Sequence, residues 1–147
     1  MFCGIESAKQ GREMEPAKIV ARYANGRMVK GYTKNFSPNR DIFHISPVEA
    51  KDPGQMVTIR VPELKGVFIV RDFAGDPKYE EKKNFQYAVQ INGRKVEVTF
   101  KDGEVIVGST FCFSSDGLGF FLFPCDPNCN TQRVFVVNEA VQWVRTL

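Results

Sequence analysis

Two stretches of the chain alternate hydrophobic and polar positions, and each stretch runs into a dipeptide that favours a tight turn. Residues 19–23 and 96–100 follow a period of two, which predicts strands with one buried face. Asn-Gly at 25–26 and Asp-Gly at 102–103 come next. These dipeptides are typical of two-residue primed turns, because both central positions need a positive φ. Each stretch is therefore expected to open with a β-hairpin.

A second glycine, Gly31 or Gly108, follows each turn within sequence that is otherwise typical of a strand. A glycine there predicts a sharp bend. The remaining strands are expected at 42–46, 56–61 and 66–70, and at 119–124, 133–138 and 141–147. Five short strands with a bent second strand predict a small, highly curved barrel.

The two stretches are copies of one unit. Residues 18–70 align with 95–147 at a constant offset of 77 without a gap. The aligned pairs include Gly26 with Gly103, Gly31 with Gly108, Phe36 with Phe113, Pro47 with Pro124, and Val57 with Val134. We therefore expect a mostly β protein with two tandem five-stranded barrels, at 18–70 and 95–147.

The segments outside the repeats have different expectations. Residues 1–17 form an N-terminal extension that is either without regular structure or a short helix. Residues 71–94 are expected to be an ordered connector, in which Asp76 before Pro77 predicts a short helix over 77–83. Alternation over 85–91 predicts an extra strand. The barrels are expected to pack together through Phe68, Phe73, Phe85 and Trp143.

Composition and charge exclude several classes. The chain has 147 residues, of which 43% are hydrophobic, and its apolar runs are far shorter than the roughly 20 residues that a membrane helix needs. The N-terminus has no apolar leader, so a cytoplasmic location is expected. The net charge is only +3, with basic residues scattered, so the balance permits nucleic-acid binding without indicating it.

Candidate chemistry is sparse. Of the four cysteines, Cys125 and Cys129 are the closest in sequence, and reduced structural thiols are expected rather than a metal site. The single histidine, His44, is expected to be a partly buried strand residue, while Ser37 and Ser114 are expected to cap loops. No nucleophile motif, phosphate loop or paired carboxylates accompany them. We expect no catalysis, no cofactor and no metal.

The pattern V-x-V-x-x-K-D-G-x-x-x-x-G at 96–108 resembles the first motif of the Sm-like family, and 134–144 resembles the second. This resemblance implies an Sm-like fold and, as an alternative function, RNA binding through Asn39, Arg40 and Arg60. It also implies pairing between the fourth strand of one unit and the fifth strand of another. Two fused units could satisfy one such pairing internally, which would leave a monomer or homodimer.

A second resemblance involves N-x-S-x-x-R at 35–40 and C-x-S-x-x-G at 112–117, which are similar to the loop motif of PilZ domains. It implies cyclic di-GMP binding by residues of these motifs together with a basic pair on the first strand. The candidate ligand residues are Lys18, Arg22, Asn35, Ser37, Arg40 and Ser114.

The stretches at 31–45, 67–77, 119–128 and 133–138 resemble an uncharacterised bacterial family that occurs alone or beside PilZ and signalling domains. Together, these patterns favour a non-enzymatic bacterial binding or adaptor module with a protein partner, in a signalling context. An adaptor of this kind is expected to expose apolar surface or an open sheet edge. Cyclic di-GMP binding and RNA binding stay as alternatives.

Overall fold

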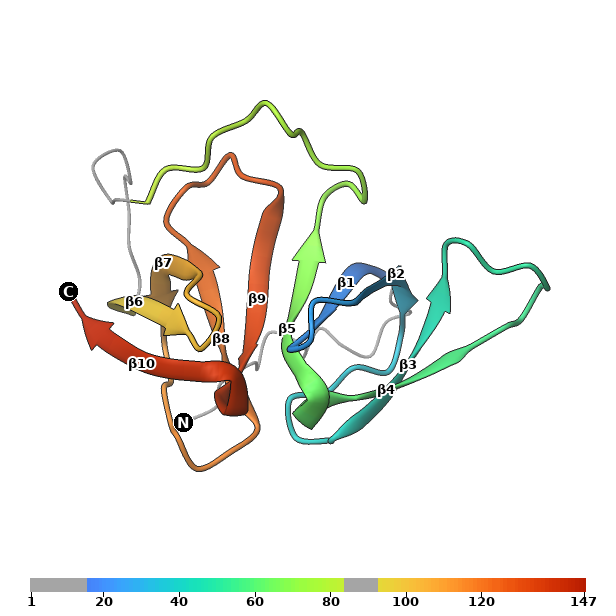
Figure 1. Cartoon of the computed structure of the whole chain (residues 1–147), viewed down its shortest axis with the longest axis horizontal. Helices are drawn as coiled ribbons and strands as arrows, with labels where there is room; N and C mark the ends of the chain where they lie inside the picture. The colour runs from blue at the N-terminus through green and yellow to red at the C-terminus, as the bar shows by residue number, and fades with distance from the viewer. Residues whose placement is uncertain (1–15, 84–92) are drawn as a thin grey trace.

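The computed structural model describes residues 16–83 and 93–147, and strands dominate both parts (Figure 1). The described strands are β1 (Ala17–Tyr23), β2 (Met28–Thr33), β3 (Ile42–Pro47), β4 (Val57–Arg60), β5 (Leu64–Val70), β6 (Arg94–Phe100), β7 (Val105–Thr110), β8 (Gly119–Pro124), β9 (Thr131–Val137) and β10 (Val141–Thr146). Single 3₁₀ turns, η2 (Val61–Glu63) and η3 (Asn138–Ala140), precede β5 and β10. The prediction of a mostly β protein is confirmed.

The repeat in the sequence is also a repeat of elements. β1 begins at Ala17 and β6 at Arg94, 77 residues later, and the same shift carries β2 onto β7, β3 onto β8, and η2 onto η3. Within each repeat the strands are arranged in the order fifth, first, second, third, fourth. The expected internal equivalence of the two halves is therefore present in three dimensions.

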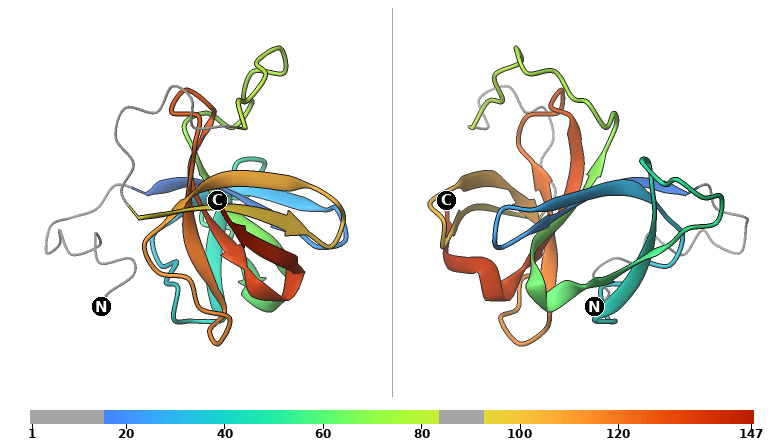
Figure 2. Two further views of the ribbon diagram at one scale, coloured as in Figure 1. Left: turned by 90° about the vertical axis from the view of Figure 1, so that its left-hand side faces the viewer. Right: turned by 45° about the vertical axis from the view of Figure 1, so that its right-hand side comes forward.

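The prediction of two separate five-stranded barrels is wrong, because the strands form one open sheet of ten in the described residues. Its order is β10-β6-β7-β8-β9-β5-β1-β2-β3-β4. The two halves join where β5 of the first repeat pairs antiparallel with β9 of the second (Figures 1 and 2). Val67 lies opposite Phe135 and Phe68 opposite Val134. This is the predicted pairing of a fifth strand with a fourth strand, made within one chain.

Both opening hairpins form as predicted, but their turns are of another type. Gly26 N–H donates to Tyr23 O at 3.0 Å, and Gly103 N–H donates to Phe100 O at 2.9 Å. Only the glycine has a positive φ in each turn, +96° and +97°, and no described non-glycine residue does. A turn followed by one left-handed glycine is the pattern of a three-residue hairpin loop with a bulge, not of a primed turn.

Gly31 and Gly108, at which bends were predicted, lie where two backbones approach closely. A Cβ built on Gly31 would meet Ser46 O, and one on Gly108 would meet Phe123 O, both at less than 3.0 Å. At these glycines the second strand of each repeat pairs with the third strand, with Gly31 opposite Pro47 and Gly108 opposite Pro124. Only glycine lets these backbones approach each other so closely.

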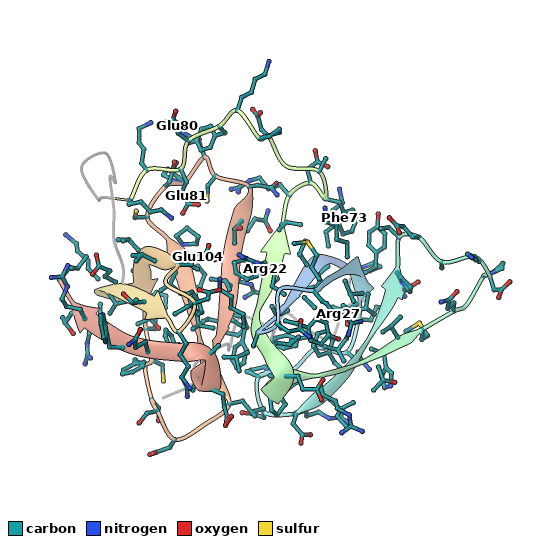
Figure 3. All side chains as sticks on the ribbon, viewed as in Figure 1. Arg22, Arg27, Phe73, Glu80, Glu81 and Glu104 are labelled. Atoms are coloured by element: carbon teal, nitrogen blue, oxygen red, sulfur yellow. The ribbon has the colours of Figure 1, made fainter. Side chains whose placement is uncertain are left out.

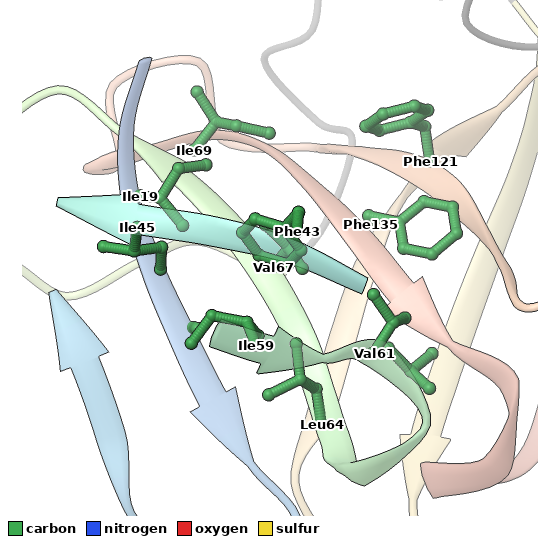
Figure 4. Packing of buried hydrophobic residues seen from close by; sticks show 12 residues of the cluster. Ile19, Phe43, Ile45, Ile59, Val61, Leu64, Val67, Ile69, Phe121 and Phe135 are labelled. Atoms are coloured by element: carbon green, nitrogen blue, oxygen red, sulfur yellow. The ribbon is translucent and has the colours of Figure 1, made fainter. Parts of the chain in front are cut away.

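The core consists of two clusters, and each one includes residues of both repeats. Phe121 and Phe135 of the second repeat pack into the first cluster around Phe43 (Figure 4). Val20 and Phe68 of the first repeat pack into the second cluster. Burial of one such aromatic side chain contributes roughly 1.5–3 kcal/mol. The repeats therefore share their cores across the β5–β9 junction.

The connector differs from its prediction over the residues that the structure describes. Residues 77–83 form a turn followed by chain without regular secondary structure, instead of a helix. Asp76 Oδ1 accepts the N–H of Lys78, but the following residues turn to Asp126, which accepts Tyr79 O–H at 2.5 Å and Lys82 N–H at 2.9 Å. These distant contacts replace the local hydrogen bonds of a helix. The extra strand predicted at 85–91 and most of the N-terminal extension lie outside the described residues.

The cysteines agree only in part with the expectation of reduced structural thiols. Cys125 and Cys129 are free and buried, and burial raises the pKa of the Cys129 thiol to about 11, so it stays protonated at neutral pH. Cys112, in contrast, is disulfide-bonded. None of the described helices is long and apolar enough to cross a membrane.

Candidate functional site

The sheet has two edges at which backbone groups lack a neighbouring strand among the described residues. β4 pairs only with β3, and β10 pairs only with β6. Hydrogen bonds alternate in direction along an antiparallel pair. Because Val61 N–H donates to Asp41 and Leu147 N–H donates to Lys95, the amides of Thr58 and Thr146 point away from the sheet. Each edge can therefore hydrogen-bond an additional strand.

A groove lies beside β4. It has a volume of about 400 Å³ and is lined by Met28, Val29, Lys30, Pro47, Val48, Glu49, Gln55 and Val57. Met28 is 51% exposed and Val48 is 45% exposed, and Met56, next to this groove in the sequence, is 54% exposed. Several large apolar side chains are thus open to solvent next to an unpaired edge strand.

The equivalent place in the second repeat is a smaller pocket of about 190 Å³. Its residues Ile106, Pro124 and Val134 are the counterparts of Val29, Pro47 and Val57 in the groove. Val20, Phe68 and Val70 of the first repeat line this pocket, together with Glu81 and Lys83 of the connector. We call the pocket covered, because β1 and β5 contribute side chains to it, and the groove uncovered, because no strand pairs with the outer side of β4 among the described residues.

Ion pairs hold β1 and β5 against the second repeat beside the covered pocket. The ammonium of Lys65, buried on β5, contacts Asp102 at 2.7 Å and also contacts Glu104. Arg22 bonds Glu104 at 2.9 Å, and Figure 3 shows the two side chains side by side at the junction. The hydrogen bond from Lys65 lowers the pKa of Asp102. Burial alone would raise the pKa of Glu104, but bonds from Lys65 and Arg22 outweigh it and lower that pKa.

The structure places the basic candidates of β1 in contacts within the protein. Lys18 Nζ donates to Arg71 O at 3.2 Å. The Arg22 guanidinium, besides bonding Glu104, lies 4.9 Å from the centre of the Phe68 ring. The junction pocket is lined by Arg22 but by neither Lys18 nor Arg40. The structure therefore does not bring these three basic side chains together in that pocket.

The loop candidates serve local structure. Ser37 Oγ accepts the N–H of Asn39, and Ser114 Oγ accepts the N–H of Asp116, so both serines cap their loops as predicted. Asn35 Oδ1 accepts the N–H of His44, a partly buried strand residue as predicted.

Arg40 and Arg60 are both exposed and lie at one end of the β3–β4 hairpin. Arg60 lies opposite Ile42 in the ladder, and Ile42 follows Arg40 by two positions in the sequence. The ladder thus places both arginines at the same end of the hairpin, whereas Lys18 and Arg22 lie along β1.

Sequence reasoning missed the groove residues Met28 and Val48, since single exposed apolar side chains are ordinary on a protein surface. A signal was present in the repeat alignment. Phe68 and Phe121 pack in the core clusters that the two repeats share. In the repeat alignment their equivalents are the polar residues Arg145 and His44. Where equivalent positions differ in polarity, the two copies have different surroundings. This contrast marks which copy is covered.

The described residues contain no group of three or more histidine, cysteine, aspartate or glutamate side chains that could hold a metal ion. No curated protein and no solved structure shows a significant match to the chain. The model of a family of unknown function, DUF6982, matches residues 15–147. The match covers nearly the whole chain, and the protein therefore belongs to this family.

Proposed function

We propose that the protein is a non-enzymatic adaptor of bacterial signalling that binds an extended segment of a protein partner at an open edge of its sheet. The observation that supports this most is the open ten-stranded sheet, whose edges β4 and β10 each have one unpaired side in the described residues. Strand addition at such an edge derives affinity from main-chain hydrogen bonds and specificity from adjacent side-chain pockets. The groove beside β4 supplies a pocket of this kind.

The two alternatives have less support. Binding the phosphates of cyclic di-GMP needs free basic side chains. Of the basic pair on β1, however, Arg22 is bonded to Glu104 and Lys18 donates to a backbone carbonyl. For RNA, Arg40 and Arg60 are exposed at one end of the β3–β4 hairpin, but two basic residues are a small fraction of the phosphate contacts that nucleic-acid binding normally uses.

Selection of displayed random peptides against the whole protein tests the proposal. Thr58→Pro removes the outward amide of β4, and Thr146→Pro removes that of β10, while both leave the existing ladder bonds in place. We expect the selected peptides to lose binding to one of these two variants and to keep binding to the other. Peptides that bind both variants as well as the parent, or a selection that recovers none, would show that the edges are not used.

A further inference from the structure

We propose that the groove beside β4 receives an extended segment of another protein that carries bulky apolar side chains two residues apart, as Phe68 and Val70 are on β5. This inference rests on the proposed function and specifies its site and the chemistry of its partner. The occupant follows from the structure itself, because the second repeat already holds such a segment in the equivalent place.

The junction supplies the template. β5 pairs with β9 so that Phe68 lies opposite Val134 and Val70 opposite Thr131. Both side chains enter the second hydrophobic cluster, where they are almost fully buried. Val57 on β4 is the counterpart of Val134 on β9. A strand that paired with β4 in the same register would place its aromatic residue opposite Val57 and its aliphatic residue near Gly54.

The groove offers what such a strand needs. In the covered pocket, Phe68 and Val70 pack beside Ile106 and Pro124, whereas in the groove the counterparts Val29 and Pro47 have no strand over them among the described residues. The uncovered volume is about 400 Å³, against about 190 Å³ in the covered state. Methionine side chains such as Met28 adapt to differently shaped apolar partners. Exposed apolar surface beside an open edge is typical of interaction sites.

A second copy of this chain fits the groove poorly. Its free fifth strand is β10, which carries Trp143 where β5 has Gly66. A Cβ on Gly66 would already lie 3.1 Å from Phe135 O and 3.2 Å from Val134 Cγ2, so a tryptophan at that position would require these neighbours to move. Arg145 stands where β5 has Phe68, and it is paired with Glu97 at 2.8 Å. Burying this pair would cost desolvation energy that an apolar side chain does not incur.

The probe that tests the inference is the fluorescein-labelled peptide ELKGVFIVRD, which copies Glu63–Asp72, added to the whole protein and followed by anisotropy. Val48→Glu places a charge in the groove at a side chain that is 45% exposed. We expect the parent to bind the peptide, and Val48→Glu to bind it about tenfold more weakly or worse. Phe111→Glu, at an exposed position 60% accessible outside the groove, is the matched control and is expected to bind as the parent does. A peptide in which Phe68 is replaced by arginine is expected to lose binding.

Equal binding by the parent and Val48→Glu, or equal binding of the two peptides, would overturn the inference. Loss of binding in Thr146→Pro with retention in Thr58→Pro would also overturn it, while leaving the proposed function intact, since the segment would then pair with β10. Sedimentation of the parent tests the second copy as occupant. Self-association that Val48→Glu abolishes would replace a foreign segment with β10 of another molecule. Melting curves of each variant confirm that the fold is retained.

Discussion

At the scale of single residues, glycine positions determine where the strands can cross. Gly31 and Gly108 occupy equivalent positions, and in both repeats a side chain there would collide with a backbone carbonyl of the third strand. The signal for this bend is local, because a glycine inside a strand-like sequence is unusual, so the sequence alone predicts it. Gly117, in contrast, lies in a loop where a Cβ would meet no atom within 4 Å.

Gly108→Ala is therefore expected to destabilise the protein, because the new Cβ must displace the Phe123 carbonyl and the β7–β8 crossing. Overpacking of this kind costs about 1–3 kcal/mol of unfolding free energy. Gly117→Ala is the control, and its effect is expected to stay within about 0.5 kcal/mol. Urea unfolding of the three proteins measures the difference. Equal midpoints for the parent and Gly108→Ala would contradict the crowded geometry at the bend.

At the scale of elements, local signals predicted the hairpins and strands well but failed for the connector. Asp76-Pro77 is a helix-start signal, yet no helix follows it, because Asp126, more than 40 residues away, accepts hydrogen bonds from Tyr79 and Lys82. Asp126 itself is buried in the loop between Cys125 and Cys129. The segment whose cysteines were considered as metal ligands therefore positions the connector through hydrogen bonds. No local sequence pattern predicts hydrogen bonds between segments so far apart in the chain.

The contact of β5 with the β6–β7 turn gives the junction a dependence on pH. Asp102 and Glu104 have lowered pKa values in the folded protein through their bonds to Lys65 and Arg22. Groups of this kind stabilise the fold above their unfolded pKa values, about 3.9 and 4.3, and lose that contribution as the pH falls through the lower folded values. We expect the unfolding free energy to decline below about pH 4.5.

Urea unfolding from pH 3 to pH 6 measures this decline, and Asp102→Asn with Glu104→Gln is expected to flatten it. Glu97→Gln is a suitable control because it breaks the pair with Arg145, whose side chain is 64% exposed at the sheet edge. Exposed pairs contribute little, so this variant should keep most of the acid-dependent slope of the parent. A double variant with the same slope as the parent would exclude the junction carboxylates as its source.

At the scale of the whole molecule, the repeat could be predicted but the way in which its copies combine could not. An offset of 77 identifies two equivalent units, and each unit does contain five strands in the same order. The residues that seat the junction, such as Phe68 and Phe135, are apolar strand positions like any others in the sequence. Trp143, predicted to help join the halves, is instead 55% exposed on the edge strand β10, away from the junction. Only the non-local β5–β9 pairing decides which apolar residues are covered.

Shared cores imply that the halves depend on each other for folding. A fragment of residues 84–147 lacks Val20, Phe68 and Val70, which complete the second cluster, and a chain of about 60 residues has little apolar burial to spare. We expect this fragment to unfold without a cooperative transition when alone, and to regain one when residues 1–83 are added. The same first fragment with Phe68→Arg should fail to restore the transition, whereas Val48→Glu, in the uncovered groove, should restore it. Denaturant titration of each mixture by circular dichroism measures the outcome. Cooperative unfolding of 84–147 alone, with the denaturant slope expected for its full surface, would show that the second repeat folds independently and that the junction joins two finished units.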